Sequence, residues 1–142
     1  MATETKLRQL ADKGCPVYYF YSSERYLVRQ AVTAITRILT ADSDEDATVL
    51  DGAAPEIEQL IMAAGTISFF GTRRVVVLPE IDPAAYSDKD LEELNSTLSS
   101  LENAVVVLGS VFELERSKLK TGKRAQKLIA QCKALGYTEE LA

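Results

Sequence analysis

The chain has 142 residues, of which 46% are hydrophobic and 26% charged, and its formal net charge is −5. This length suffices for one domain that folds without a metal or a disulfide. The sequence contains no histidine, which excludes His-assisted nucleophiles and zinc chemistry. The net charge argues against a domain devoted to nucleic-acid binding, because such proteins neutralise phosphates with surplus Lys and Arg.

The first residues are polar, and no apolar run approaches the length of a signal sequence or a membrane span. We therefore expect a soluble, cytoplasmic domain without membrane contact. Cys15 and Cys132 are far apart in the sequence. A chain of this class is expected to keep both thiols reduced and partly buried.

In chain order, the first third predicts a helix, a strand and a second helix. The helix spans Glu4–Lys13 and ends at Gly14. The strand Val17–Tyr21 is apolar at both alternating sets of positions, which favours a central strand buried on both faces, although aromatic strands can also stack nucleobases. Ser22–Glu24 caps the second helix. Its apolar stripe consists of Leu27, Ala31, Ala34, Ile35 and Ile38.

The middle of the chain predicts a short strand, a helix and another buried strand. Ala47–Leu50 forms the first of these, and Pro55 opens a helix that Gly65 closes. The residues expected on the inner face of this helix are Ile57, Leu60, Ile61 and Ala64. Val75–Leu78 is the second strand, and Pro79 ends it.

A capping pattern opens the next helix, because Ser87 is followed three residues later by Asp90. Its apolar stripe is Leu91, Leu94, Leu98 and Leu101. The strand Ala104–Gly109 follows, and then a loop from Ser110 to Lys120.

A basic helix from Gly122 to Ala134 and a last strand beginning at Tyr137–Thr138 complete the chain. Strands alternate with helices throughout. This alternation predicts an α/β fold, a three-layer open parallel sheet formed by residues 1–142 as a single domain.

A phosphate-binding loop would follow the first strand of such a sheet. The connection Tyr21–Leu27 has no glycine and no Gly-Lys-Ser/Thr ending, and Glu24 would repel phosphate at the helix N-terminus. Glu80 and Asp82 resemble the acids that hold magnesium in nucleotide hydrolases, but Pro79 breaks the register. We expect no cofactor and no catalytic site.

Two adjacent aromatic residues, Phe69 and Phe70, occupy the connection between Gly65 and the strand at Arg74. Connections usually run over the surface, where two exposed rings would forfeit roughly 1.5 to 3 kcal/mol of burial each. Either the loop tucks both rings under the sheet, or they form a hydrophobic plug for the pocket of a partner.

The charges are unevenly distributed along the chain. Ala41 to Glu58 contains acidic residues and no basic one, namely Asp42, Asp44, Glu45, Asp46, Asp51, Glu56 and Glu58. Arg116 to Lys133 contains basic residues and no acidic one, namely Arg116, Lys118, Lys120, Lys123, Arg124, Lys127 and Lys133. The sequence thus predicts two oppositely charged flanks.

The aromatic first strand with its glycine-poor turn, Arg25–Val28, Thr48–Gly52 and above all the block Ser68–Val77 resemble one family. This family is the delta subunit of bacterial DNA polymerase III, whose N-terminal domain is similar to AAA+ ATPases without a working phosphate-binding loop. The resemblance extends from Val17 to about Gly136, and it implies that the chain is the N-terminal domain of a longer protein.

The resemblance implies a function in the clamp loader of the DNA polymerase III holoenzyme. In that family a serine and two large apolar residues insert into a hydrophobic pocket of the sliding clamp and help to open the ring, while other loader subunits hydrolyse ATP. The positions carried over are Ser68, Phe69 and Phe70, with Ile67 and Arg73 beside them. The family usually has Leu where this chain has Phe69.

The implied partners are therefore the sliding clamp, which is the beta subunit, other clamp-loader subunits, and DNA indirectly within the complex. Candidate residues for contact with DNA or a subunit are Lys118, Lys120, Lys123, Arg124 and Lys127, unless this helix is simply a solvated face. Two alternatives stay open: a nucleotide-binding domain with a non-standard phosphate site, and a DNA-binding module that uses the basic stretch 118–133.

Overall fold

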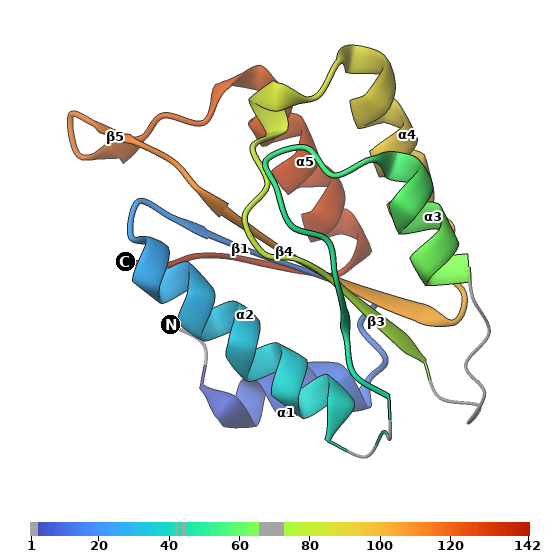
Figure 1. Cartoon of the computed structure of the whole chain (residues 1–142). Coiled ribbons are helices and arrows are strands. Elements are labelled where there is room, and N and C mark those ends of the chain that lie inside the picture. Colours follow the sequence, from blue (N-terminus) through green and yellow to red (C-terminus); the bar gives the residue numbers. More distant parts are fainter. Residues whose placement is uncertain (1–2, 42, 44, 66–72) are drawn as a thin grey trace.

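The computed structural model describes residues 3–41, 43, 45–65 and 73–142. Five parallel strands form a sheet in the order β2-β3-β4-β1-β7 (Figure 1). Their bounds are β1 Val17–Ser22, β2 Thr48–Val49, β3 Arg74–Leu78, β4 Ala104–Val111 and β7 Tyr137–Glu140. The helices are α1 Glu4–Asp12, α2 Arg25–Thr40, α3 Ile57–Gly65, the 3₁₀ turn η1 Pro83–Ala85, α4 Asp88–Ser99 and α5 Gly122–Leu135.

Helices cover both faces of the sheet, so the expected three-layer α/β architecture is confirmed (Figure 1). On one face, Tyr18 and Phe20 of β1 pack against α1 and α2. On the other face, Val17 and Tyr19 pack against α3, α4 and α5. The two alternating sets of apolar residues in β1 therefore enter two different cores, as strands of parallel sheets usually do.

The strongest local signals in the sequence mark real elements. β1, β3 and β4 lie where unbroken apolar runs predict them. The hydroxyl of Ser87 accepts a hydrogen bond from the backbone N–H of Asp90 at 3.1 Å, which confirms the cap of α4. The thiols of Cys15, half-buried, and Cys132, buried, are free.

Gly109 in β4 is required because the chain that follows β3 passes very close to it. The backbone N–H of Ile81 donates to the carbonyl of Gly109 at 2.8 Å. This bond draws the chain after β3 so close that a Cβ on residue 109 would collide with the carbonyl oxygen of Pro79 and lie 2.8 Å from Cγ1 of Val28. Gly109 thus permits the crossing through its lack of a side chain.

The expected inner face of α3 is wrong at one position. Ile57 and Leu60 are buried, but Ile61 is 50% exposed. A nine-residue helix against β3 and β4 buries only a narrow stripe, and Ile61 turns toward the gap between α3 and α4. Helix α4 is also shorter than its apolar stripe suggests, because it ends at Ser99 and leaves half-buried Leu101 beyond it.

The expected loop from Ser110 to Lys120 is wrong as well. β4 continues to Val111, because Ser110 and Val111 still pair with Tyr21 and Ser22 of β1. An antiparallel hairpin follows, formed by β5 Leu114–Glu115 and β6 Lys118–Leu119. Its turn places Arg116 and Ser117 at φ values of 54° and 66°. Residues other than glycine rarely adopt positive φ. The residue types Arg and Ser therefore did not indicate a turn at these two positions.

Candidate functional site

The connection between α3 and β3 starts and ends at the amino-terminal edge of the sheet. α3 finishes at Gly65, and Arg74, the first residue of β3, is paired with Ala104, the first of β4. Of the residues that resemblance assigns to clamp binding, Ile67, Ser68, Phe69 and Phe70 lie outside the described residues. The two arginines that follow them are described.

Arg73 connects three parts of the domain at this edge. Its Nη1 donates to the carbonyl oxygen of Gly14 at 3.1 Å, and its Nη2 donates to that of Ala104 at 3.3 Å. Gly14 follows α1 with φ of 77°, and Ala104 begins β4. The guanidinium predicted to contact the clamp is thus bound to backbone carbonyls of its own domain.

Arg74 fixes the other side of the same strand end. Its Nη1 lies 2.6 Å from Oε2 of Glu45, and the two side chains are only 24% and 19% exposed. Its backbone N–H donates to the carbonyl of Asn103 at 2.8 Å. No local pattern predicts this pair, apart from the acidic residues around Glu45. Together, Arg73 and Arg74 hold the start of β3 against its neighbours on both sides.

The half-buried thiol of Cys15 lies near this edge, where its Sγ approaches the carbonyl oxygen of Val17 at 3.4 Å. Burial raises the pKa of Cys15 above its ordinary value. Burial also raises the pKa of Cys132, to about 12, on the opposite face of the sheet. Nucleophilic cysteines have depressed pKa values, so neither thiol has the character of a catalytic group.

A crevice of about 540 Å³ lies at the opposite edge, where the strands end. Ligands bind at this edge in open α/β sheets. Arg25 at the start of α2 makes two bonds to Glu80, of 2.6 and 3.1 Å. The carboxylate of Asp82 accepts from the backbone N–H of Ala84 at 3.0 Å. Three charged groups of this crevice, those of Arg25, Glu80 and Asp82, therefore have partners within the chain.

The predicted basic residues gather beyond the same carboxyl edge, on the β5–β6 hairpin and the first half of α5 (Figure 1). Lys118, Lys120, Lys123, Arg124 and Lys127 are all exposed. Within the described part of the chain, Arg124 alone of these five forms an ion pair, with Nε at 3.0 Å from Oδ1 of Asp88.

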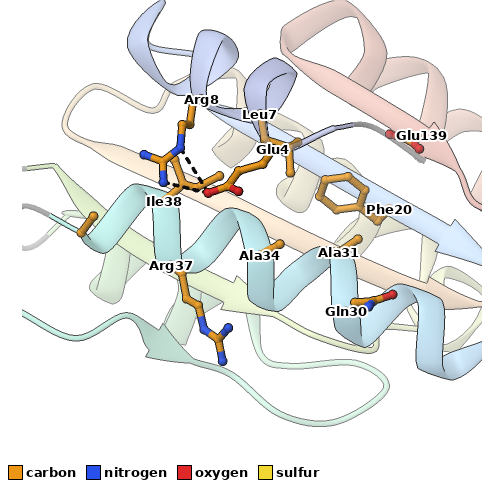
Figure 2. A pocket seen from close by; sticks show the side chains of 11 residues that line it. Glu4, Leu7, Arg8, Phe20, Gln30, Ala31, Ala34, Arg37, Ile38 and Glu139 are labelled. Carbon is orange, nitrogen blue, oxygen red and sulfur yellow. Dashed lines mark hydrogen bonds and ion pairs between the residues drawn. The ribbon is translucent and has the colours of Figure 1, made fainter.

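A further hollow of about 460 Å³, which the sequence did not suggest, lies between α1 and α2. Figure 2 shows the side chains that line it. Its floor is apolar and includes Leu7, Phe20 and Ala34. On its rim, Glu4 and Arg8 are paired at 2.8 Å. The lining offers room for an apolar group.

The described residues contain no cluster of acidic or cysteine side chains suited to a metal ion. No helix in the described ranges has the length and apolar character needed to cross a membrane.

Comparison with known proteins identifies the fold and the family. Structurally, the chain is similar to the Bacillus subtilis DNA clamp loader delta protein, with a TM-score of 0.68, 25% identity and coverage of 98% of this chain and 42% of that one. It also shares its fold with a DNA polymerase III gamma subunit-related protein from Thermotoga maritima, with a TM-score of 0.67 and 14% identity over 99% of this chain and 46% of that one.

In sequence, the chain is 28% identical over 137 residues to DNA polymerase III subunit delta of Bacillus subtilis strain 168, covering 87% of this chain and 39% of that protein. It thus spans about two fifths of the length of these delta relatives. The family described as "DNA polymerase III, delta subunit" matches residues 18–135. The chain belongs to the family of the delta subunit of DNA polymerase III.

Proposed function

We propose that this chain is the clamp-binding, N-terminal part of a clamp-loader delta subunit. The observation that carries the proposal is the family match over residues 18–135, which includes the whole connection between α3 and β3. Phe69 and Phe70 insert into a hydrophobic pocket of the sliding clamp, with Ile67 and Ser68 beside them. Binding favours the open form of the ring, so that DNA can enter.

The contacts of Arg73 and Arg74 support this assignment. A protruding plug binds well only if its base is held in place, because ordering a mobile segment on binding costs free energy. Arg73 bonds to the carbonyls of Gly14 and Ala104, and Arg74 pairs with Glu45. The segment 66–72 is therefore followed by a firmly held strand end.

The assembly proposed for the whole protein includes the sliding clamp, other clamp-loader subunits, and DNA within the complex. ATP is hydrolysed by other subunits in this scheme. The crevice at the carboxyl edge supports it, because a nucleotide would have to displace the Arg25–Glu80 pair and would meet no glycine-rich loop.

Calorimetry with the purified sliding clamp tests the proposal. Phe69→Ala/Phe70→Ala is expected to weaken clamp binding by about a thousandfold, and each single change by roughly thirtyfold, because buried aromatic anchors are each worth about 2 kcal/mol or more. Circular dichroism confirms that the variants are folded.

The matched control is Tyr26→Ala, because Tyr26 is 71% exposed and lies in the first turn of α2, at the other edge of the sheet. It should bind the clamp as the wild type does. Unchanged binding by the folded double variant would refute the assignment, as would an equal loss in the control.

A further inference from the structure

Arg73 lies directly between the connection 66–72 and β3, and its guanidinium is bound to backbone atoms of its own domain. Nη1 donates to the carbonyl oxygen of Gly14 at 3.1 Å, and Nη2 donates to that of Ala104 at 3.3 Å. Gly14 follows α1, and Ala104 is the first residue of β4. The forked shape of a guanidinium suits such an attachment at two points. The side chain therefore fixes the place where the chain enters β3.

Arg74, the next residue, attaches the same strand end on the side of β2. Its Nη1 lies 2.6 Å from Oε2 of Glu45, and its Nη2 lies 3.5 Å from Oγ1 of Thr48, the first residue of β2. Both members of the ion pair are mostly buried, so either charge would be left poorly solvated without the other. Because β3 lies between β2 and β4 in the sheet, the two arginines attach its first residues to both neighbouring strands.

This attachment bears on binding through the cost of ordering the chain. A binding segment whose end is already fixed loses less conformational freedom when it meets a partner, so the same contacts give a higher affinity. Gly14, Glu45 and Ala104 belong to three separate stretches of the chain, so the attachment exists only in the assembled domain. The two arginines thus set the position of one end of the connection 66–72.

We infer that Arg73, Arg74 and Glu45 are positioning residues for clamp binding, which act through their bonds within the domain and do not touch the clamp. The inference rests on the proposed function, which by itself involves only residues of the connection 66–72. It gives Arg73 a role different from the clamp contact that the family resemblance implies. It also adds Glu45, which lies before β2 and well away from the connection in the sequence.

Two variants of Arg73, measured by calorimetry with the purified sliding clamp, separate positioning from direct contact. Arg73→Ala is expected to weaken clamp binding about tenfold. Arg73→Lys keeps the positive charge but has one nitrogen in place of the two that reach Gly14 and Ala104, so it should weaken binding almost as much. A charge that met the clamp directly would survive in Arg73→Lys. Wild-type affinity of that variant would therefore overturn the inference for Arg73.

Exchanging the two charges tests the pair of Arg74 and Glu45. Glu45→Gln and Arg74→Glu should each weaken clamp binding, by about fivefold and about tenfold. The exchange variant Glu45→Arg/Arg74→Glu restores opposite charges and should bind better than Arg74→Glu alone, because the two residues act through each other. Binding by the exchange variant that is weaker than that of Arg74→Glu would contradict the positioning role of the pair.

Tyr19→Phe is the control for a general loss of stability. This variant loses a buried hydrogen bond to Ser110, toward the carboxyl edge, and should be destabilised about as much as Glu45→Gln while its clamp affinity stays unchanged. An equal loss of affinity in Tyr19→Phe would show that the effect of Glu45→Gln is only structural. Circular dichroism confirms that every variant is folded at the temperature of the binding measurement.

The results also separate this inference from the proposed function. If the wild type does not bind the clamp, or if Phe69→Ala/Phe70→Ala binds it unchanged, the proposed function fails. If that double variant loses binding while the variants of Arg73, Arg74 and Glu45 bind as the wild type does, the inference alone is overturned.

Discussion

The two edges of the sheet use their charged residues differently. At the carboxyl edge, Arg25 and Glu80 are neighbours in space that pair with each other at the surface, 56% and 39% exposed. At the amino edge, Arg73 and Arg74 reach Gly14 beyond α1, the start of β4 and the segment before β2. Open α/β sheets usually bind ligands at the carboxyl edge. In this chain the arginines that connect separate parts of the domain lie at the other edge, beside the connection proposed to bind the clamp.

The strongest test of this difference between the edges is to remove the partly buried pair of Arg74 and Glu45 at the amino edge. Arg74→Met should lower the free energy of unfolding by about 2 kcal/mol, because it leaves the carboxylate of Glu45 without its guanidinium. Urea denaturation measures the change. Arg29→Met serves as the control, since Arg29 is exposed on α2; equal midpoints for the two variants would contradict the anchoring role.

A second and smaller effect is expected at two neighbouring tyrosines of β1, which differ in the hydrogen bonding of their hydroxyls. Both are fully buried, but the hydroxyl of Tyr19 bonds to Ser110 at 2.6 Å, whereas that of Tyr18 makes no hydrogen bond of ordinary geometry within the described ranges and has only a weakly hydrogen-bonding thiol, that of Cys15, beside it. Tyr19→Phe should therefore cost about 1 kcal/mol of stability. Tyr18→Phe should be nearly neutral or stabilising, because the thiol of Cys15 satisfies the buried hydroxyl only weakly.

Thermal unfolding of the two phenylalanine variants provides the measurement. Removing either hydroxyl changes the packed volume very little, so the difference between the variants reports on the hydrogen bond. A larger loss of stability for Tyr18→Phe than for Tyr19→Phe would show that Tyr18 has an energetically important partner.

The smallest effect is expected at the carboxyl edge. Glu80→Gln should leave Tm nearly unchanged, because exposed ion pairs contribute little to stability. Nucleotide with magnesium should stabilise neither the wild type nor this variant, since the connection Tyr21–Leu27 has no glycine. A nucleotide-dependent rise in Tm would support the alternative that the chain is a nucleotide-binding domain.

The sequence predicted those parts of the fold that local patterns encode. Unbroken apolar runs identified β1, β3 and β4, and the cap at Ser87 identified the start of α4. The roles of the arginines could not be read in this way. Arg73 bonds to a residue 59 positions away, and Arg74 to one 29 positions away, so their partners appear only once the sheet is assembled.

The β5–β6 hairpin escaped prediction for a different reason. Two-residue hairpin turns usually contain Asn or Gly, which tolerate positive φ and make such turns recognisable in a sequence. Here Arg116 and Ser117 take those positions. The candidate clamp residues were found by resemblance, because an adjacent pair of Phe in a connection indicates a buried contact without saying with what.

The crossing at Gly109 has an evolutionary consequence. Any side chain at this position would strike the carbonyl of Pro79, and the bond from Ile81 to Gly109 draws the two segments together. A lineage could exchange the glycine only by rerouting the chain between Pro79 and Ile81 in the same step. Glycine at 109 and the course of the backbone after β3 should therefore be inherited together, whatever happens to the surface residues around them.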